Sequence, residues 1–383
     1  STPFHPLIEL LRRAAGLERS DANTARLRKL EALLARLNMD ASEHMPILVA
    51  LLSLEGADSY PAPELSPRAW RDKSFAAILA FLSAVAAQQP AVLAVEDLQW
   101  LDASSLELLD MLSAGLNKPP LLLVLSQRPD FSHAWQEDGA PTAELELKRL
   151  DSDASAALIA HIAGDINLAD DVRSQIIVRT DGIPSFIEEV TKSILEAGIL
   201  RERKGRYEAK GALPERLIPE TLKDSLMARL DGLADAKELA QIGATIGRSF
   251  THELIEAVAK MEAALLSDSL NTLSASGLID TLGEAPDAIY SFKQALVQET
   301  AYETLLRQRR QNFHERIAQA LEANFPEVIA AQPELLAHHY AVAGRGRSAI
   351  GYWMQAGARA RKRSAEIEAI EHFTKALELL GQA

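Results

Sequence analysis

The sequence predicts an α/β segment followed by all-α segments. Two apolar runs of strand length, 90–95 and 119–125, flank a helical pattern over 104–116, which is the order of a β-α-β unit. Because both runs lack polar residues, we expect a sheet that is covered on both faces. Aromatic residues make up 5% of the chain and Ala and Leu are abundant, which favours helix-on-helix packing elsewhere.

Four segments before the first strand have helical patterns. They cover 6–15, 24–37, 46–54 and 70–89, and a proline-rich loop at 56–67 separates the last two. An alternation of Glu and Leu at 143–150 adds one candidate strand. We place a first domain, with the two strands, at 1–150.

Helical patterns replace the strands after Asp151. Those at 153–163, 169–180 and 185–197 predict a small helical domain at 151–213. It ends in a connection rich in Gly, Lys and Arg at 201–211.

The segment 214–303 predicts three helices and a β-hairpin, which is the pattern of a winged-helix domain. The hairpin strands are 278–282 and 288–292. Binding to DNA is one option for such a domain, but 261–295 carries five acids against Lys293 as its only base. A recognition helix on phosphate does not carry that balance, so we expect packing inside the protein instead.

Only helices are predicted at 304–383. Small and large residues between Trp353 and Ala376 have tetratricopeptide (TPR) spacing, but two registers fit equally well, so we predict a TPR-like α-solenoid without fixed repeat boundaries. The basic run 307–310 predicts a solvated helix face, with an acidic partner surface as the alternative. His338 and His339 diverge by about 100° on a helix, which predicts packing and not a shared metal.

Composition excludes several functions. The 383 residues suffice for two to four domains and carry a formal charge of −14, which argues against a nucleic-acid or anionic-membrane surface. Without cysteine there are no disulfides, cysteine zinc sites or thiol catalysis. No apolar run approaches the ~20 residues of a membrane span and no signal peptide opens the chain, so we expect a cytoplasmic protein.

The strongest chemical signal is the acid pair Glu96-Asp97, which follows the first apolar strand. P-loop NTPases build their Walker B site by placing two acids at the end of a buried strand. The first acid holds Mg²⁺, and the second polarises the water that attacks the γ-phosphate. The alternative is that the acids simply meet solvent, and that Asp102 with Ser104 caps the next helix.

Two further signals lie downstream. Arg128 follows the second strand within Ser126-Gln127-Arg128, the position of a sensor that feels the γ-phosphate; an ordinary strand end is the alternative. Gly182 and Pro184 form a rigid turn that opens a helix and can press against an adenine ring. An ordinary helix start with Pro near its first position explains them equally.

Several stretches resemble STAND-type signalling ATPases, an AAA-like class of P-loop proteins. The first is 92–102, which contains the Walker B acids, and the later ones are 218–231, 246–250, 292–302 and 336–340. The set looks most like bacterial regulators in which an adenylate or guanylate cyclase domain precedes the ATPase. The resemblance covers nearly the whole chain.

The resemblance implies an ATP-dependent switch with nucleotide between the core and its helical lid. Glu96 takes the Mg²⁺ role, Asp97 the catalytic-acid role and Arg128 the sensor role, while Gly182 and Pro184 lie at the adenine. Many P-loop ATPases have Asp where this chain has Glu96. The implied cofactors of the full-length protein are ATP or ADP with Mg²⁺.

One departure limits these implications. The 383 residues contain no Gly-x-x-x-x-Gly-Lys-[Ser/Thr], the Walker A loop that cradles the β- and γ-phosphates. The chain begins at Ser1, so we expect a partial P-loop core that starts after the Walker A region. We expect this fragment to bind no nucleotide tightly and not to hydrolyse ATP.

The sequence leaves three outputs open. The resemblance favours regulation of a linked cyclase domain, with a protein partner or small ligand at the C-terminal helices. The second is a large transcription regulator with a terminal helix-turn-helix. The third is a protein-binding scaffold that works without ATP.

Overall fold

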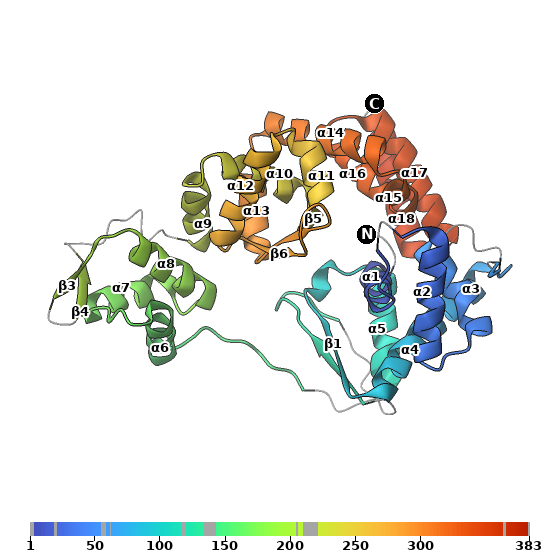
Figure 1. Ribbon diagram of the computed structural model, residues 1–383, viewed down its shortest axis with the longest axis horizontal. Helices are drawn as coiled ribbons and strands as arrows, with labels where there is room; N and C mark the ends of the chain where they lie inside the picture. Colours follow the sequence, from blue (N-terminus) through green and yellow to red (C-terminus); the bar gives the residue numbers. More distant parts are fainter. Residues whose placement is uncertain are drawn as a thin grey trace. The chain divides into compact units, whose positions relative to one another are not determined.

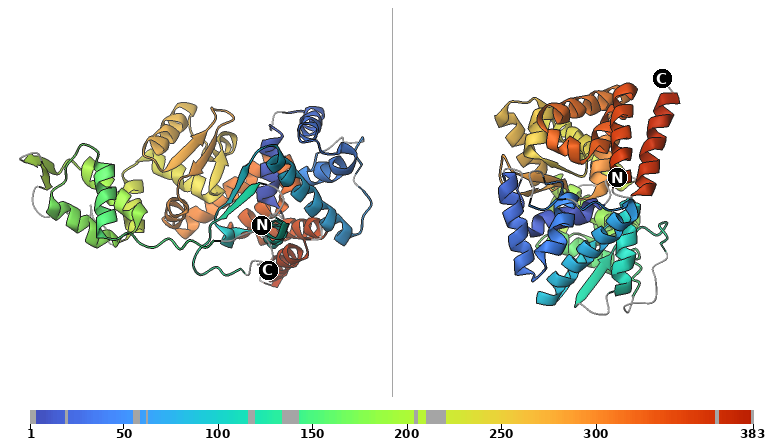
Figure 2. Two further views of the ribbon diagram at one scale, coloured as in Figure 1. Left: turned by 90° about the horizontal axis from the view of Figure 1, so that it is seen from below. Right: turned by 90° about the vertical axis from the view of Figure 1, so that its right-hand side faces the viewer.

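The computed structural model describes residues 4–18, 21–54, 59–61, 63–115, 120–133, 143–203, 206–209, 221–362 and 365–381. Ser1, the start of the resembling stretch at 218–220 and the expected boundary at 213/214 lie outside these ranges. The chain divides into two compact units, one of Ser1–Ala143 with Phe325–Ala383 and one of Glu144–Asn324. Each unit is described by itself (Figures 1 and 2).

The first unit opens with the four helices that the sequence predicts. They are α1 (His5–Ala14), α2 (Asn23–Arg36), α3 (Ala41–Leu52) and α4 (Pro67–Gln88). The third begins earlier than expected, because Asp40 caps it by accepting the Ser42 N–H at 2.8 Å and Pro46 lies inside the helix. Ser66 caps α4 in the same way, with Pro67 at its first position.

The β-α-β unit is confirmed. Strands β1 (Ala91–Val95) and β2 (Leu121–Leu125) pair in parallel, and α5 (Ala103–Gly115) connects them after a short 3-10 turn, η1 (Leu98–Trp100). The prediction of a sheet covered on both faces is wrong for the described residues. Leu93 and Leu123 face the core, whereas Val92 and Leu122 on the other face are 66% and 59% exposed.

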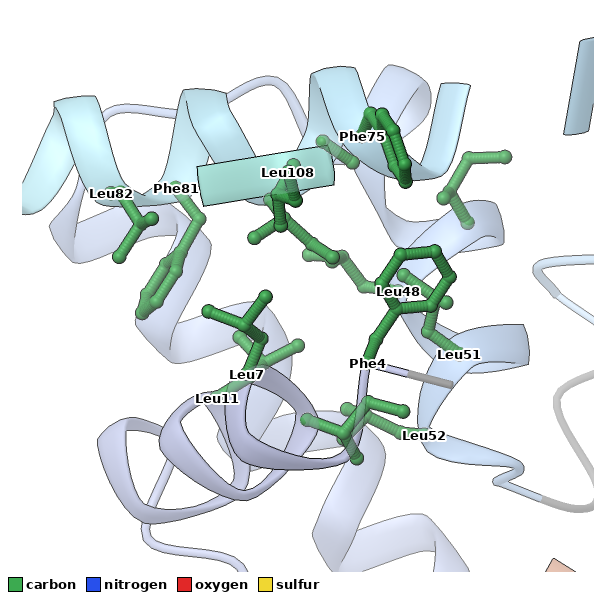
Figure 3. Packing of buried hydrophobic residues seen from close by; sticks show 14 of the residues in the cluster. Phe4, Leu7, Leu11, Leu48, Leu51, Leu52, Phe75, Phe81, Leu82 and Leu108 are labelled. Carbon is green, nitrogen blue, oxygen red and sulfur yellow. The ribbon is translucent and has the colours of Figure 1, made fainter. Parts of the chain in front are cut away.

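Helices and the inner sheet face share one hydrophobic core, part of which is shown in Figure 3. Phe4 packs edge-on against Phe75 with 5.3 Å between the ring centroids. Leu48, Leu52 and Leu108 join them from α3 and α5. This core fixes the direction of β1 and therefore the position of the acids at its end.

The first unit also contains four C-terminal helices. They are α15 (Pro326–Ala331), α16 (Pro333–Val342), α17 (Gly346–Lys362) and α18 (Glu366–Gly381). A Cβ on Gly357 would lie 2.5 Å from the Phe373 ring, so glycine lets α17 and α18 approach closely. His339 is buried, as predicted for a packing residue, whereas His338 is exposed.

The second unit begins with three helices around a small apolar core. They are α6 (Ser152–Ala163), α7 (Asp170–Thr180) and α8 (Pro184–Glu196). The predicted connection at 201–211 instead begins as a hairpin, β3 (Leu200–Arg203) and β4 (Arg206–Ala209), because Leu200 and Tyr207 pack on that core. The strand expected at 143–150 is absent: this described stretch is extended and unpaired as a strand, with Leu145 and Leu147 exposed.

The rest of the second unit combines helices with a small sheet. The elements are α9 (Leu222–Asp231), α10 (Asp235–Ile246), β5 (Ser249–Thr251), α11 (His252–Ala259), α12 (Ala263–Ala275), β6 (Ile279–Leu282), β7 (Ile289–Phe292), α13 (Ala295–Glu303) and α14 (Arg307–Asn324). The predicted hairpin is present as β6 and β7, and β5 joins its other edge in the antiparallel order β5-β7-β6. Phe250 stacks on Tyr290 between sheet and helices.

The basic run on α14 has the solvated face that the sequence predicts, since residues 307–309 are exposed, and three arginines of α14 also contact neighbouring elements. Arg309 pairs with Glu238 at 2.8 Å, Arg310 lies over the Tyr302 ring at 4.4 Å, and Arg316 donates to the Ala259 carbonyl at 2.9 Å. These three arginines thus connect α14 to neighbouring elements.

Within the described ranges, no helix has the length and apolar content needed to cross a membrane.

Candidate functional site

The carboxyl ends of β1 and β2 are tied together by Ser126. The Asp97 N–H donates to Ser126 Oγ at 3.1 Å, and the Leu98 N–H donates to the Ser126 carbonyl at 3.0 Å. Ser126 N–H donates in turn to the Val95 carbonyl at 3.0 Å. The chain turns sharply here, since Asp97 has a left-handed φ of 58°, a conformation that Asp adopts more readily than most residues. The acid pair therefore has a fixed backbone beside the second strand.

Gln99 links the acid to the second strand, and sequence reasoning missed it. Its Nε2 donates to Asp97 Oδ1 at 3.2 Å, and its Oε1 accepts the Arg128 N–H at 3.3 Å. The carboxamide thus holds the carboxylate of one strand end and the backbone of the other. A side-chain amide two residues after the acid is a weak signal, because its partners depend on the register of two strands.

Arg128 lies at this same edge, and its role as a sensor stays a prediction. Its guanidinium is 5.7 Å from the centre of the Trp100 ring, and Trp100 is 65% exposed. A cation over an aromatic face is held by electrostatic attraction to the ring. The structure thus brings three predicted residues, Glu96, Asp97 and Arg128, to one sheet edge.

The acids suit a magnesium ion only in part. Glu96 is exposed and Asp97 is partly exposed, so their carboxylates can meet a hydrated cation. Among the described residues no group of three or more acids or histidines forms a metal site. Mg²⁺ is commonly held by one or two carboxylates completed by water and nucleotide phosphates, which fits this pair. The residues do not suit the phosphates of the nucleotide, because the sequence contains no Walker A loop to bind them.

Asp102 has a separate, structural role. Its Oδ1 accepts the Ser105 N–H at 2.8 Å, which makes it the cap of α5. The alternative interpretation of Asp102 as a helix cap is therefore confirmed, with Ser105 and not Ser104 as its hydrogen-bond partner. Burial is the main cause that raises the pKa of its carboxyl group.

Gly182 and Pro184 belong to the second unit. Gly182 has φ +70°, and a Cβ there would lie 2.2 Å from the Leu150 carbonyl oxygen, so close backbone packing requires glycine. The Leu150 N–H donates to the Gly182 carbonyl at 2.8 Å. Pro184 is the first residue of α8. Both residues thus have structural reasons to be there, and their contact with adenine stays a prediction.

One family model matches the part of the chain that contains β1 and α5. Residues 1–124 match the family model of the AAA ATPase domain, a match that includes Glu96 and Asp97 and ends before Arg128. This stretch is therefore similar to the AAA ATPase domain family, which confirms the AAA-like part of the predicted resemblance.

Two longer matches were found. An uncharacterized protein of Rhizobium meliloti is 31% identical over 322 residues, which cover 82% of this chain and 30% of that protein. A Pyrococcus horikoshii signal transduction ATPase with numerous domains (STAND), with a tetratricopeptide repeat sensor, is 14% identical at a TM-score of 0.46. The match covers 89% of this chain and 50% of that structure. The chain thus spans half or less of the length of both proteins.

Proposed function

We propose that this chain is the ATPase and sensor portion of a STAND-type bacterial signalling switch that works in the cytoplasm. The observation that carries the proposal is the sheet edge where Ser126 and Gln99 hold Asp97 next to the Arg128 backbone. These hydrogen bonds hold the carboxylate of Asp97 near the backbone of Arg128, so an acid and a residue with a cationic side chain lie on neighbouring strand ends, as a γ-phosphate sensor needs. The AAA ATPase match over the same acids supports it.

The residues take the following roles in the proposal. Glu96 holds Mg²⁺ and Asp97 orients and polarises a water, while Arg128 detects the γ-phosphate. Bound Mg²⁺ would supply neutralisation of phosphate charge. Gly182 and Pro184 contact the adenine from the lid formed by α6, α7 and α8.

The chain alone does not hydrolyse ATP under this proposal. Without the Walker A glycines and lysine, its residues provide no cradle for the β- and γ-phosphates, and positioning these groups supplies most of the catalysis. Nucleotide binding by this chain is correspondingly weak. ATP or ADP with Mg²⁺ are the cofactors of the full-length protein.

The remaining domains supply input and output. The winged-helix domain at 214–303 packs within the protein and does not bind DNA, since 261–295 carries five acids and one base. The TPR-like helical region at 304–383 binds a protein partner or small ligand. The output is a linked adenylate or guanylate cyclase domain, as the sequence resemblance indicates.

A metal-binding measurement tests the strand-end site. Mn²⁺ is a spectroscopic substitute for Mg²⁺, and free Mn²⁺ can be followed by electron paramagnetic resonance during titration with and without ADP. We expect binding to weaken in Glu96→Gln and Asp97→Asn, because each removes one carboxylate ligand. Glu144→Gln, an exposed acid in the extended stretch, is the matched control. Equal binding by wild type and both site variants would contradict the proposal.

A further inference from the structure

A second acidic group lies shortly after the strand-end site, at the start of α5. Besides the Ser105 N–H, Asp102 accepts the Ser105 hydroxyl at 2.6 Å and the Phe4 N–H at 3.3 Å. The residue is 4% exposed. Asp102 thus joins the beginning of α1 to the beginning of the helix that follows the Walker B acids.

The neighbouring N–H of α5 is bound by a residue from the C-terminal helices. The Ser104 N–H donates to Glu368 Oε1 at 3.1 Å, and Glu368 lies in the first turn of α18 with 2% of its surface exposed. The first N–H groups of a helix have no partner within it, and an acid there is favoured by hydrogen bonding and by the helix dipole. Glu368 therefore completes the cap that Asp102 begins.

Arg359 forms an independent tie between the same two parts of the chain. Its Nη2 donates to Ser53 Oγ at 2.8 Å, and its Nη1 donates to the Ala330 carbonyl at 2.7 Å. Ser53 is the residue with left-handed φ that ends α3. The C-terminal helices thus contact residues 1–124, called the ATPase segment here, at the end of α3 and at the start of α5.

The contact at α5 also places two carboxylates together in a buried environment. The charge of Glu368 adds to the desolvation that raises the pKa of Asp102. Their repulsion and the loss of water oppose the gain from the N–H donors. A contact with such opposing contributions can form and break without a large change in free energy, unlike an apolar core.

We propose that α18 docks on the ATPase segment through Glu368, and that this docking carries the signal between the C-terminal helices and the strand-end site. The path is short: Glu368 binds Ser104, Asp102 caps the same helix turn, and η1 connects Asp102 to Asp97. What the signal changes at Asp97 rests on the proposed function. The docking itself does not.

Cross-linking between introduced cysteines tests the docking. Because the sequence contains no cysteine, only the introduced thiols react. The full chain carrying Ala103→Cys and Ile367→Cys, which flank the contact and leave Ser104 and Glu368 in place, is treated with a short bis-maleimide. The product is mapped by mass spectrometry. The control pairs Ala103→Cys with Glu378→Cys, which lies about 16 Å from Ile367 along α18. We expect intramolecular cross-linking in the first pair and at most traces in the control. Equal or absent cross-linking in both would overturn the docking.

Hydrogen exchange tests the signal. Glu368→Ala removes the acceptor, and we expect amides at the start of α5 to exchange at least about tenfold faster. Peptides over 96–101 should also exchange faster, because the turn that holds Asp97 loses its support. Glu368→Gln keeps an acceptor oxygen and should retain protection, and Glu371→Ala on the exposed side of α18 is the matched control.

The outcomes separate docking from function. Faster exchange in Glu368→Ala at α5 alone, with 96–101 unchanged, would refute transmission to the strand-end site. Exchange equal to wild type at both places would refute docking. Since neither readout uses metal or nucleotide, a failed Mn²⁺ titration would count against the proposed function and leave these results standing.

Discussion

The protein contains two pairs of neighbouring acids in opposite environments. Glu96 and Asp97 are neighbours in the sequence, whereas the fold brings Asp102 and Glu368 together. Glu96 and Asp97 stand at the end of β1 with solvent access, held by a polar tie from the next strand. Asp102 and Glu368 are buried at the start of α5, where backbone N–H groups occupy their oxygens. The comparison teaches that accessibility and available oxygens, and not the presence of acids, distinguish a cation site from a structural cap.

The largest expected effect comes from truncating the buried pair. Asp102→Ala removes the cap of α5 and leaves the Phe4 and Ser105 N–H groups without this acceptor. We expect a loss of about 3 kcal/mol in the free energy of unfolding of the first unit. Urea denaturation followed by circular dichroism measures it. A loss below about 0.5 kcal/mol in the free energy of unfolding would contradict the structural role of Asp102 that distinguishes the buried pair from the exposed pair.

A pH titration sharpens the comparison on the helix that carries Glu368. Burial lowers the pKa of His372 from 6.5 to about 4, and Lys375 contributes in the same direction. The unfolded chain therefore binds the proton more readily between pH 4 and 6.5, so stability falls as pH falls through this window, by up to about 3 kcal/mol. Hydrogen exchange of α17 and α18 at pH 7 and pH 5 tests this. His372→Gln should remove most of the difference, and an unchanged pH dependence in that variant would refute the assignment.

A smaller effect is expected at the tie between the strands. Ser126→Ala removes the acceptor of the Asp97 N–H, and because the group is near solvent, water compensates in part. We expect the free energy of unfolding to fall by about 1 kcal/mol or less. Exchange of the Asp97 amide should nevertheless accelerate clearly, and unchanged exchange would show that the tie does not hold the turn.

The smallest stability effect is expected at the exposed acid itself. Asp97→Asn keeps a residue that tolerates the left-handed conformation and removes only the charge. We expect a change within about 0.5 kcal/mol in urea denaturation, in contrast to Asp102→Ala. A loss as large as that of Asp102→Ala would mean that Asp97 is structural.

Local patterns predicted much of this architecture. The two apolar runs gave the parallel strands, and the acids after the first run were placed correctly at its end. The hairpin of β6 and β7 followed from two short runs around a turn. These features depend on neighbours in the sequence, which is why they could be predicted.

The missed features depend on contacts between distant residues. Glu368 looks like any acid in a first helical turn, and only the fold places it on Ser104. Gln99 requires the register of two strands. The apolar face with Val92 and Leu122 was expected to be covered because the sequence of a strand reports its own polarity and not the elements that pack on it.

The most direct test of the central claim is steady-state ATP hydrolysis by this chain and its Asp97→Asn variant. The claim is that the acids at the strand ends supply the magnesium ligands of an ATP site. The Walker A loop that would bind the phosphates is absent from these 383 residues. It predicts no turnover above background for either protein, with Mn²⁺ binding weaker in the variant. Turnover by the wild type that is lost in Asp97→Asn would contradict it.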